Sequence, residues 1–280
     1  MNPIRRIGHE ARLAAVALQF LTRVPLRFAH FDPQWLQDCA RHFPLVGAGV
    51  GAFGAAVLLA AVQAWPPVVA VALAMAATIW LTGGFHEDGL ADTCDGLGGA
   101  VERARALQIM KDSRLGSYGA LGLVLTLGTK AAVLTVLTQQ QPLLAASALV
   151  LAHAWSRSGA VALLAWLPYA GDADHAKAKP LAQHIGPAAL AVALAWCALL
   201  AWGVPALAAA LAPWLDGAAA ASAGLQPARL LQAALAAAAV ALWCGRWLRR
   251  RLGGFTGDGL GATQQWCELA VYLALAAGHG

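Results

Sequence analysis

Apolar blocks about as long as a bilayer is thick recur along the whole 280-residue chain. A transmembrane helix needs about 20 consecutive, mainly apolar residues. Hydrophobic residues make up 60% of the chain and charged residues only 12%, against roughly 25% charged in soluble domains. Blocks of the required length, and one shorter segment, lie at 44–63, 66–85, 118–138, 143–167, 187–204, 228–248 and 265–278. The sequence therefore predicts an all-α polytopic membrane protein, a single bundle of six or seven transmembrane helices.

Lysine and arginine are distributed unequally between the predicted connections. Of the 19 such residues, 16 lie in segments that share one side if the spans alternate: 1–42, 86–117, 168–185 and 246–251. The connections on the other side contain none: 64–67, 139–142 and 205–227. Because cytoplasmic loops are enriched in Lys and Arg, the basic side is expected to face the cytoplasm. The net charge of +5 then indicates contact with anionic lipid headgroups, and we expect no nucleic-acid partner.

No linker or soluble appendage is long enough to fold alone, so residues 1–280 are interpreted as one integral-membrane catalytic domain. Within it, 1–42 forms a cytoplasmic or interfacial arm, and 83–117 forms an acidic segment with the expected active site. The apolar stretch 13–22 of the arm is flanked by arginines, a pattern typical of an interfacial amphipathic helix.

The most informative local feature is a group of carboxylates between glycines at 83–99. Glu87, Asp88, Asp92 and Asp95 are four of only 14 acidic residues in the chain. In a helix, Asp88, Asp92 and Asp95 follow i, i+4, i+7 and share one face. Like charges on one face repel unless a cation lies among them. Several Asp and few His favour Mg²⁺, so this spacing predicts a Mg²⁺ site for phosphoryl transfer.

Other polar residues near the predicted membrane surface fit the same chemistry. Asp112 is expected to complete the metal set from the next helix, and Lys111 and Arg114 flank it as counter-ions for substrate phosphates. One remaining acid would accept the proton of an attacking hydroxyl. Asp258 lies in the glycine run 253–262, where backbone N–H groups can approach a phosphate.

Three basic side chains have both a structural and a functional interpretation. His86 is either a ligand or substrate contact, or it orients a neighbouring carboxylate. Lys130 and Arg157 fall inside predicted spans, where a charge costs about 2.5–3.5 kcal/mol, so each is expected to pair or to face a cavity. Arg157 is interpreted as a phosphate ligand beneath the acidic site or as a structural counter-ion.

The run Gly84–Gly96 closely resembles the signature of the cobalamin (5′-phosphate) synthase family, also called adenosylcobinamide-GDP ribazoletransferases. Further stretches resemble this family and occur in its order across nearly the whole chain: Phe20–Pro25, Arg41–Gly47, Met110–Gly116 and Thr256–Asp258. The resemblance implies a Mg²⁺-dependent enzyme of the cell inner membrane. Such an enzyme joins adenosylcobinamide-GDP to α-ribazole, or to its 5′-phosphate, releases GMP and closes the nucleotide loop of cobalamin.

The residue chemistry and the resemblance together give a working hypothesis for the roles of particular residues. The metal set is expected to consist of Asp88, Asp92, Asp95 and Asp112. The general base remains open among Glu87, Asp88 and Asp112. The expected substrate contacts are His86, Lys111, Arg114, Arg157 and Asp258.

Two other functions fit part of the pattern. Asp92-x-x-Asp95-Gly96 looks like the first half of the signature of the CDP-alcohol phosphotransferases, to which the family is related in chemistry, but the second half is not matched. A cation transporter would instead place carboxylates near the bilayer midplane, whereas these acids cluster at one predicted face. The sequence leaves the oligomeric state open, a homo-oligomer included.

Overall fold

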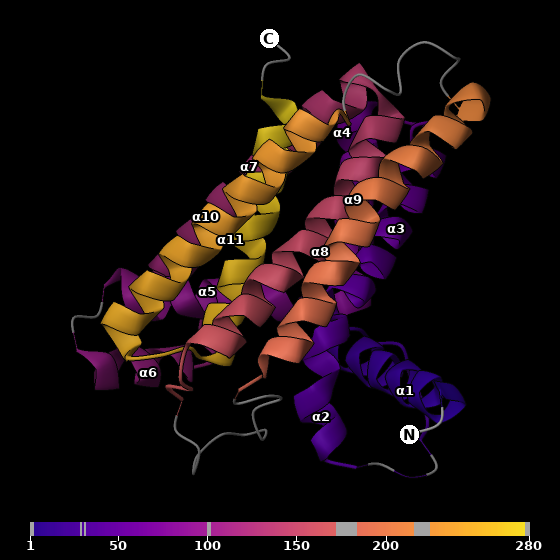
Figure 1. Cartoon of the computed structure of the whole chain (residues 1–280). Coiled ribbons are helices and arrows are strands. Elements are labelled where there is room, and N and C mark those ends of the chain that lie inside the picture. The colour runs from indigo at the N-terminus through magenta and orange to yellow at the C-terminus, as the bar shows by residue number, and fades with distance from the viewer. Residues whose placement is uncertain are drawn as a thin grey trace.

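The computed structural model describes residues 3–28, 30, 32–99, 102–171, 184–215 and 225–277. In this part of the chain the secondary structure is helical, with no strand and one isolated bridge between Tyr169 and Phe255. The helices are α1 Pro3–Leu21, α2 Gln34–Asp38, the 3₁₀ helix η1 Cys39–His42, α3 Phe43–Ala61, α4 Pro67–Thr82, α5 Phe85–Gly98, α6 Arg103–Met110, α7 Ser117–Gln140, α8 Pro142–Trp166, α9 Pro187–Leu215, α10 Pro227–Leu252 and α11 Gly257–Ala276 (Figure 1).

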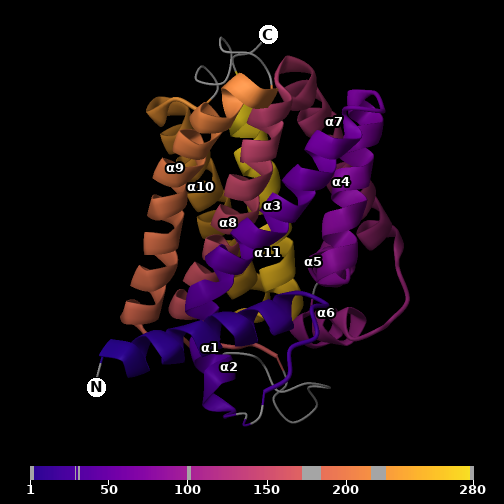
Figure 2. The same cartoon turned by 90° about the vertical axis from the view of Figure 1, so that its right-hand side faces the viewer.

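The long helices form one bundle, whose described part contains five of the predicted six or seven spans and a bent helix pair at the place of a sixth. Five segments of the described chain are long and apolar enough to cross a membrane: Gln34–Ala61, Ser117–Gln140, Pro142–Trp166, Pro187–Pro213 and Pro227–Leu252. The pair α4 and α5 passes the same test together, although the two helices meet at 89°. The prediction of an all-α membrane bundle is therefore confirmed. Helix α8 packs against α3, α9, α10 and α11, and α11 packs against α5, α7 and α10 (Figure 2).

Two predicted boundaries were wrong. The connection expected from residue 205 begins later, because α9 continues through Pro205 to Leu215. Proline is tolerated inside membrane helices, and the alanine- and leucine-rich sequence on both sides of Pro205 favours a continued helix. The short last segment is also a full helix, since α11 begins at Gly257 rather than near 265. Residues 216–224 lie outside the described part of the chain.

The N-terminal arm forms a helix that crosses one end of the bundle (Figure 2). Its buried residues Leu13, Val16, Ala17 and Leu21 recur at helical spacing. Glu10 ties the helix to η1, because its carboxylate lies 3.4 Å from the Arg41 guanidinium and 2.9 Å from His42 Nε2. The helix predicted at 13–22 is thus present, and longer than expected.

The described parts of the basic segments gather at the end of the bundle that α1 crosses, whereas Lys177 and Lys179 lie outside the described residues. This end also carries α6 and the C-terminal ends of α8 and α10 (Figures 1 and 2). The last turn of α10 contributes Arg249, Arg250 and Arg251. We refer to it below as the basic end.

Candidate active site

The acidic segment forms a helix that turns sharply away from α4. Gly83 and Gly84 connect the two helices with φ angles of +75° and +72°. This left-handed region suits glycine because a Cβ is disfavoured there. Two such residues in succession accompany the 89° bend between α4 and α5. Helix α5 therefore lies at the basic end, and its helical form confirms that Asp88, Asp92 and Asp95 share one face.

Two glycines let α5 approach α11 closely. A Cβ built on Gly89 would lie 2.9 Å from the carbonyl oxygen of Asp258 and 3.0 Å from its Cα. A Cβ on Gly261 would lie 3.2 Å from the carbonyl oxygen of His86. At Asp258 the helix α11 is just beginning, and Thr256 caps it by accepting a hydrogen bond of 3.0 Å from the Gly259 N–H. The crossing brings the acidic motif and the second glycine run, 170 residues apart between Asp88 and Asp258, to one place.

Three carboxylates meet at this crossing, and we call Asp88, Asp92 and Asp258 the acidic cluster. The carboxylate of Asp92 interacts electrostatically with those of Asp258, Asp88 and Asp95, and the carboxylate of Asp258 interacts with that of Asp88. Asp88 is exposed, whereas Asp92 and Asp258 are half-buried. Like charges in a half-buried place repel strongly unless a cation or a proton neutralises them.

Asp95 lies on the same face of α5 as Asp88 and Asp92, but its carboxylate accepts hydrogen bonds from backbone N–H groups. Its Oδ2 accepts a hydrogen bond of 2.8 Å from the Gly116 N–H, and its Oδ1 accepts one of 2.7 Å from the Gly119 N–H. These N–H groups belong to the start of α7, where a helix has unpaired donors and attracts negative charge. Asp95 therefore ties α5 to the N-terminus of α7, and its predicted role as a metal ligand stays a prediction.

Asp112 is held by an arginine in the connection between α6 and α7. The Arg114 Nε donates to both carboxylate oxygens, over 3.0 and 3.1 Å. These hydrogen bonds lower the pKa of Asp112 from 3.8 to about 2, so the carboxylate is charged at neutral pH. The Arg114 side chain is 87% exposed. Lys111 is also exposed and follows α6 directly, so both cations are open to solvent, as phosphate contacts require.

Glu87 and His86 point away from the acidic cluster, into the bundle. Glu87 Oε1 accepts a hydrogen bond of 3.0 Å from Gln265 Nε2, and its Oε2 is buried without a hydrogen-bond partner in the described structure. His86 is buried, and the charges that act on it include Arg157, Glu268 and Lys130. Helix α5 thus presents Glu87 and His86 to the bundle interior and the neighbouring Asp88 to the acidic cluster.

The bundle interior holds a polar network that the sequence did not predict as a unit. We define it as Lys130, Gln264, Gln265, Glu268 and Tyr272. Lys130 Nζ lies 3.0 Å from Glu268 Oε1 and donates to Gln265 Oε1 over 2.7 Å. Gln264 Nε2 and the Tyr272 hydroxyl donate to Glu268 over 2.6 and 3.0 Å. A buried charge is tolerated when it is paired and hydrogen-bonded, so the expectation that Lys130 pairs is confirmed.

Arg157 lies beside this network and is only 2% exposed. Its guanidinium donates to the carbonyl oxygen of His153 over 2.8 Å, and His153 Nε2 lies 3.5 Å from Glu268 Oε1. The Nε of Arg157 is buried without a partner in the described structure. The observed surroundings of Arg157 are those of a buried counter-ion, and its predicted contact with a phosphate stays a prediction.

The carboxylates of the acidic cluster suit a magnesium ion by their chemistry. They offer hard oxygen donors from three side chains, and their charges demand neutralisation. In the described residues no group of three or more His, Cys, Asp or Glu side chains is arranged to hold a metal by itself. Mg²⁺ is usually bound by one or two carboxylates together with water and substrate phosphates. The donor set therefore fits an ion that binds with the substrate.

A model of the cobalamin-5-phosphate synthase family matches residues 13–276. The chain is 59% identical over 274 residues to the adenosylcobinamide-GDP ribazoletransferase of Leptothrix cholodnii, covering 96% of this chain and 97% of that protein. It is 45% identical to the protein of the same name from Albidiferax ferrireducens, over 94% of this chain and 96% of the other. A third such protein, from Shewanella pealeana, is 41% identical over 95% of both chains. No solved structure matches the chain. By the extent of the family match and the identity to these relatives, the chain belongs to the cobalamin-5-phosphate synthase family.

Proposed function

We propose that this protein joins adenosylcobinamide-GDP to α-ribazole, or to its 5′-phosphate, in the assembly of the nucleotide loop of cobalamin. A ribose hydroxyl of the ribazole attacks the phosphorus that is attached to cobinamide. A new P–O bond forms, the bond to the GMP phosphate breaks, and GMP leaves with the electron pair. The observation that carries the proposal is the convergence of Asp88, Asp92 and Asp258 at the crossing of α5 and α11, in a chain that belongs to this family.

Mg²⁺ is the proposed cofactor, held by Asp92 and Asp258 with substrate phosphate oxygens. When bound, it would supply charge neutralisation at the phosphates. The protein groups hold the rest of the substrate charge. Lys111 and Arg114 are exposed on the connection that follows α6, where they reach phosphates from the water phase. Asp95 contributes by fixing α5 against α7 through its two hydrogen bonds.

Asp88 is the carboxylate that we assign as proton acceptor. It is exposed and lies beside the two proposed metal-holding residues, where it would accept the proton of the attacking hydroxyl. Asp112 is engaged by Arg114, and Glu87 is bonded to Gln265 inside the bundle. Both alternatives are therefore less suited to accept the proton.

We further propose that the basic end of the bundle faces the cytoplasm and that the membrane is the cell inner membrane. Retention of Lys and Arg on the cytoplasmic side supports this orientation. Soluble nucleotide substrates would reach the acidic cluster from that side. The orientation is tested by replacing Arg114 with cysteine and labelling the R114C variant in intact cells and in inverted membrane vesicles, with the unaltered protein as background. Labelling by a membrane-impermeant reagent is expected only in inverted vesicles, and labelling in intact cells would contradict it.

The direct test is turnover by the full-length protein in liposomes. With adenosylcobinamide-GDP, α-ribazole and Mg²⁺, we expect equimolar GMP and a cobalamin product, and loss of both when EDTA removes the metal. Release of CMP from a CDP-alcohol in the presence of a lipid acceptor, without GMP release, would favour a CDP-alcohol phosphotransferase. Flux of a divalent cation without transfer of any nucleotide would favour a transporter. Either result would overturn the proposal.

A further inference from the structure

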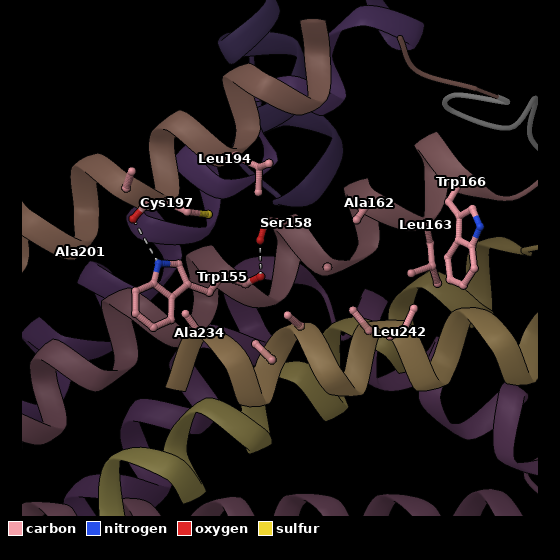
Figure 3. A pocket seen from close by; sticks show the side chains of 15 residues that line it. Trp155, Ser158, Ala162, Leu163, Trp166, Leu194, Cys197, Ala201, Ala234 and Leu242 are labelled. Carbon is pink, nitrogen blue, oxygen red and sulfur yellow. Dashed lines mark hydrogen bonds between the residues drawn. The ribbon is translucent and has the colours of Figure 1, made fainter. Parts of the chain in front are cut away.

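An apolar groove runs between α9 and α10 and has α8 as its floor (Figure 3). Its volume is about 540 Å³, within the range of pockets that hold small organic molecules. Leu163 and Trp166 of α8, Leu194 of α9 and Leu242 of α10 line it together with small alanine side chains. The groove is thus wide because its walls are built largely of alanine.

Polar atoms at the groove are already engaged. The indole N–H of Trp155 donates to the carbonyl oxygen of Cys197 over 3.3 Å, and the Ser158 hydroxyl donates to the carbonyl oxygen of Trp155 over 2.7 Å (Figure 3). Neither side chain therefore needs a polar partner from outside. The chemistry of the lining favours a hydrocarbon occupant.

The length of the groove matches one leaflet of a bilayer. Along α8 the lining residues run from Trp155, near the middle of the helix, to Trp166 at its last residue. At about 1.5 Å per residue this distance is about 16 Å. Half of the hydrocarbon core of a bilayer is about 15 Å thick. The groove therefore spans the half of the bundle that ends at the basic end.

Positive charge continues the same helix face beyond the groove. On α10, Ala234, Ala238 and Leu242 line the groove at intervals of four residues. Arg246 follows Leu242 by four residues and Arg249 by seven, and both are exposed. Residues at these intervals lie on one helix face, so both guanidinium groups follow the apolar wall toward the basic end. Trp166, 43% exposed, is at the level where tryptophan anchors proteins to headgroups.

We propose that this groove binds an anionic phospholipid, with one acyl chain against the alanines and the headgroup phosphate against Arg246 and Arg249. The apolar lining suits the acyl chain, and the length of the groove matches the depth of one leaflet. The two arginines suit the negative charge of the headgroup phosphate. This inference requires only that the bundle crosses a membrane, and it is independent of the proposed reaction.

Native mass spectrometry of the detergent-purified full chain tests the proposal with two probes, dioleoyl phosphatidylglycerol and dioleoyl phosphatidylcholine. Each basic residue near a membrane surface contributes about fivefold to the binding of an anionic lipid, so two arginines predict a preference of about 25-fold for phosphatidylglycerol. The double variant R246Q/R249Q is expected to bind both lipids equally. Equal binding of the two lipids by the unaltered protein would overturn the proposal.

Filling the groove provides the second arm. Ala238 is exposed and lines the groove, whereas its neighbour Ala239 is exposed but does not line it. We expect A238F to lose at least tenfold in phosphatidylglycerol binding and A239F to bind normally. A198F, which fills the groove from α9, is expected to repeat the loss if A238F folds poorly. Phosphatidylglycerol should raise the melting temperature of A239F but not of A238F. Equal binding by A198F, A238F and A239F would contradict the proposed site.

Discussion

Replacement of Gly89 by alanine tests how closely the active site depends on the crossing of α5 and α11. The added Cβ would lie 2.9 Å from the carbonyl oxygen and 3.0 Å from the Cα of Asp258. Ordinary contacts between such atoms are about 3.5 Å or longer, so the two helices must separate by about 0.5 Å. Both obstructing atoms are backbone, and a rotamer change cannot relieve them. Asp258 must therefore move relative to Asp92.

The size of the effect follows from the sensitivity of catalysis to position. A misplacement of about 1 Å can reduce a rate by about 100-fold, so a shift of about half that distance predicts a tenfold loss of kcat in G89A. Helix propensity acts in the opposite direction, because alanine is favoured over glycine in helices by about 0.5–1 kcal/mol. Loss of activity without loss of helical content is therefore the expected signature.

The assay is GMP release by the protein in liposomes at saturating substrate and Mg²⁺, with circular dichroism as a check on folding. Gly49→Ala is the matched control, since Gly49 is exposed in α3 and a Cβ there would meet nothing within 4 Å. We expect G49A to turn over like the unaltered protein. A G89A protein within twofold of G49A would refute the inference that this crossing positions the carboxylates.

Further predictions concern three other parts of the molecule. D88N should reduce kcat by 100-fold or more, within the range of general-base catalysis, while E87Q retains at least a tenth of the activity; the reverse order would assign the base to Glu87. K130M removes the ammonium group 3.0 Å from buried Glu268 and should lower the free energy of SDS-induced unfolding by about 3 kcal/mol. The double variant K130M/E268Q should recover most of this loss. A double variant as unstable as K130M would contradict the coupling of Lys130 to Glu268. The pKa of Asp112 is lowered from 3.8 to about 2 by hydrogen bonds from Arg114, so the stabilisation of its charged form is present above pH 4 and is lost only as the pH falls through 2. D112N should therefore leave the shape of the pH–rate profile unchanged between pH 5 and 9. A shifted profile would contradict the assignment of Asp88, rather than Asp112, as the proton acceptor.

Local pattern was sufficient to predict the helical bundle and the acidic helix. Apolar blocks of fixed length report the spans directly, because the bilayer imposes their length. The spacing of Asp88, Asp92 and Asp95 indicates one face of a helix by geometry alone. The glycine run around Asp258 was interpreted only as a place where backbone N–H groups approach a phosphate, and its use in the crossing of α5 and α11, through Gly261, was not predicted.

Side-chain contacts between helices that are distant in the chain could not be predicted from a single sequence. Nothing in the order of residues indicated that Asp95 holds the N–H groups of Gly116 and Gly119. Glu87 and Asp88 are adjacent, yet one enters the bundle and the other faces out. That difference depends on the direction in which α5 leaves Gly84. The polar positions Gln265 and Glu268 within the predicted segment 265–278, with Gln264 directly before it, were the available signal for the interior network.

Joint action of the α5 and α11 carboxylates on a Mg²⁺-dependent transfer is the core of the proposed mechanism. It is tested most directly by the Mg²⁺ dependence of GMP release in the unaltered protein, D92N and D258N, all in liposomes. Each substitution removes one negative charge from a proposed ligand, so we expect half-saturation at a Mg²⁺ concentration at least tenfold higher, with a lower kcat. A half-saturating concentration and a kcat unchanged in both D92N and D258N, in protein that inserts normally, would contradict the claim.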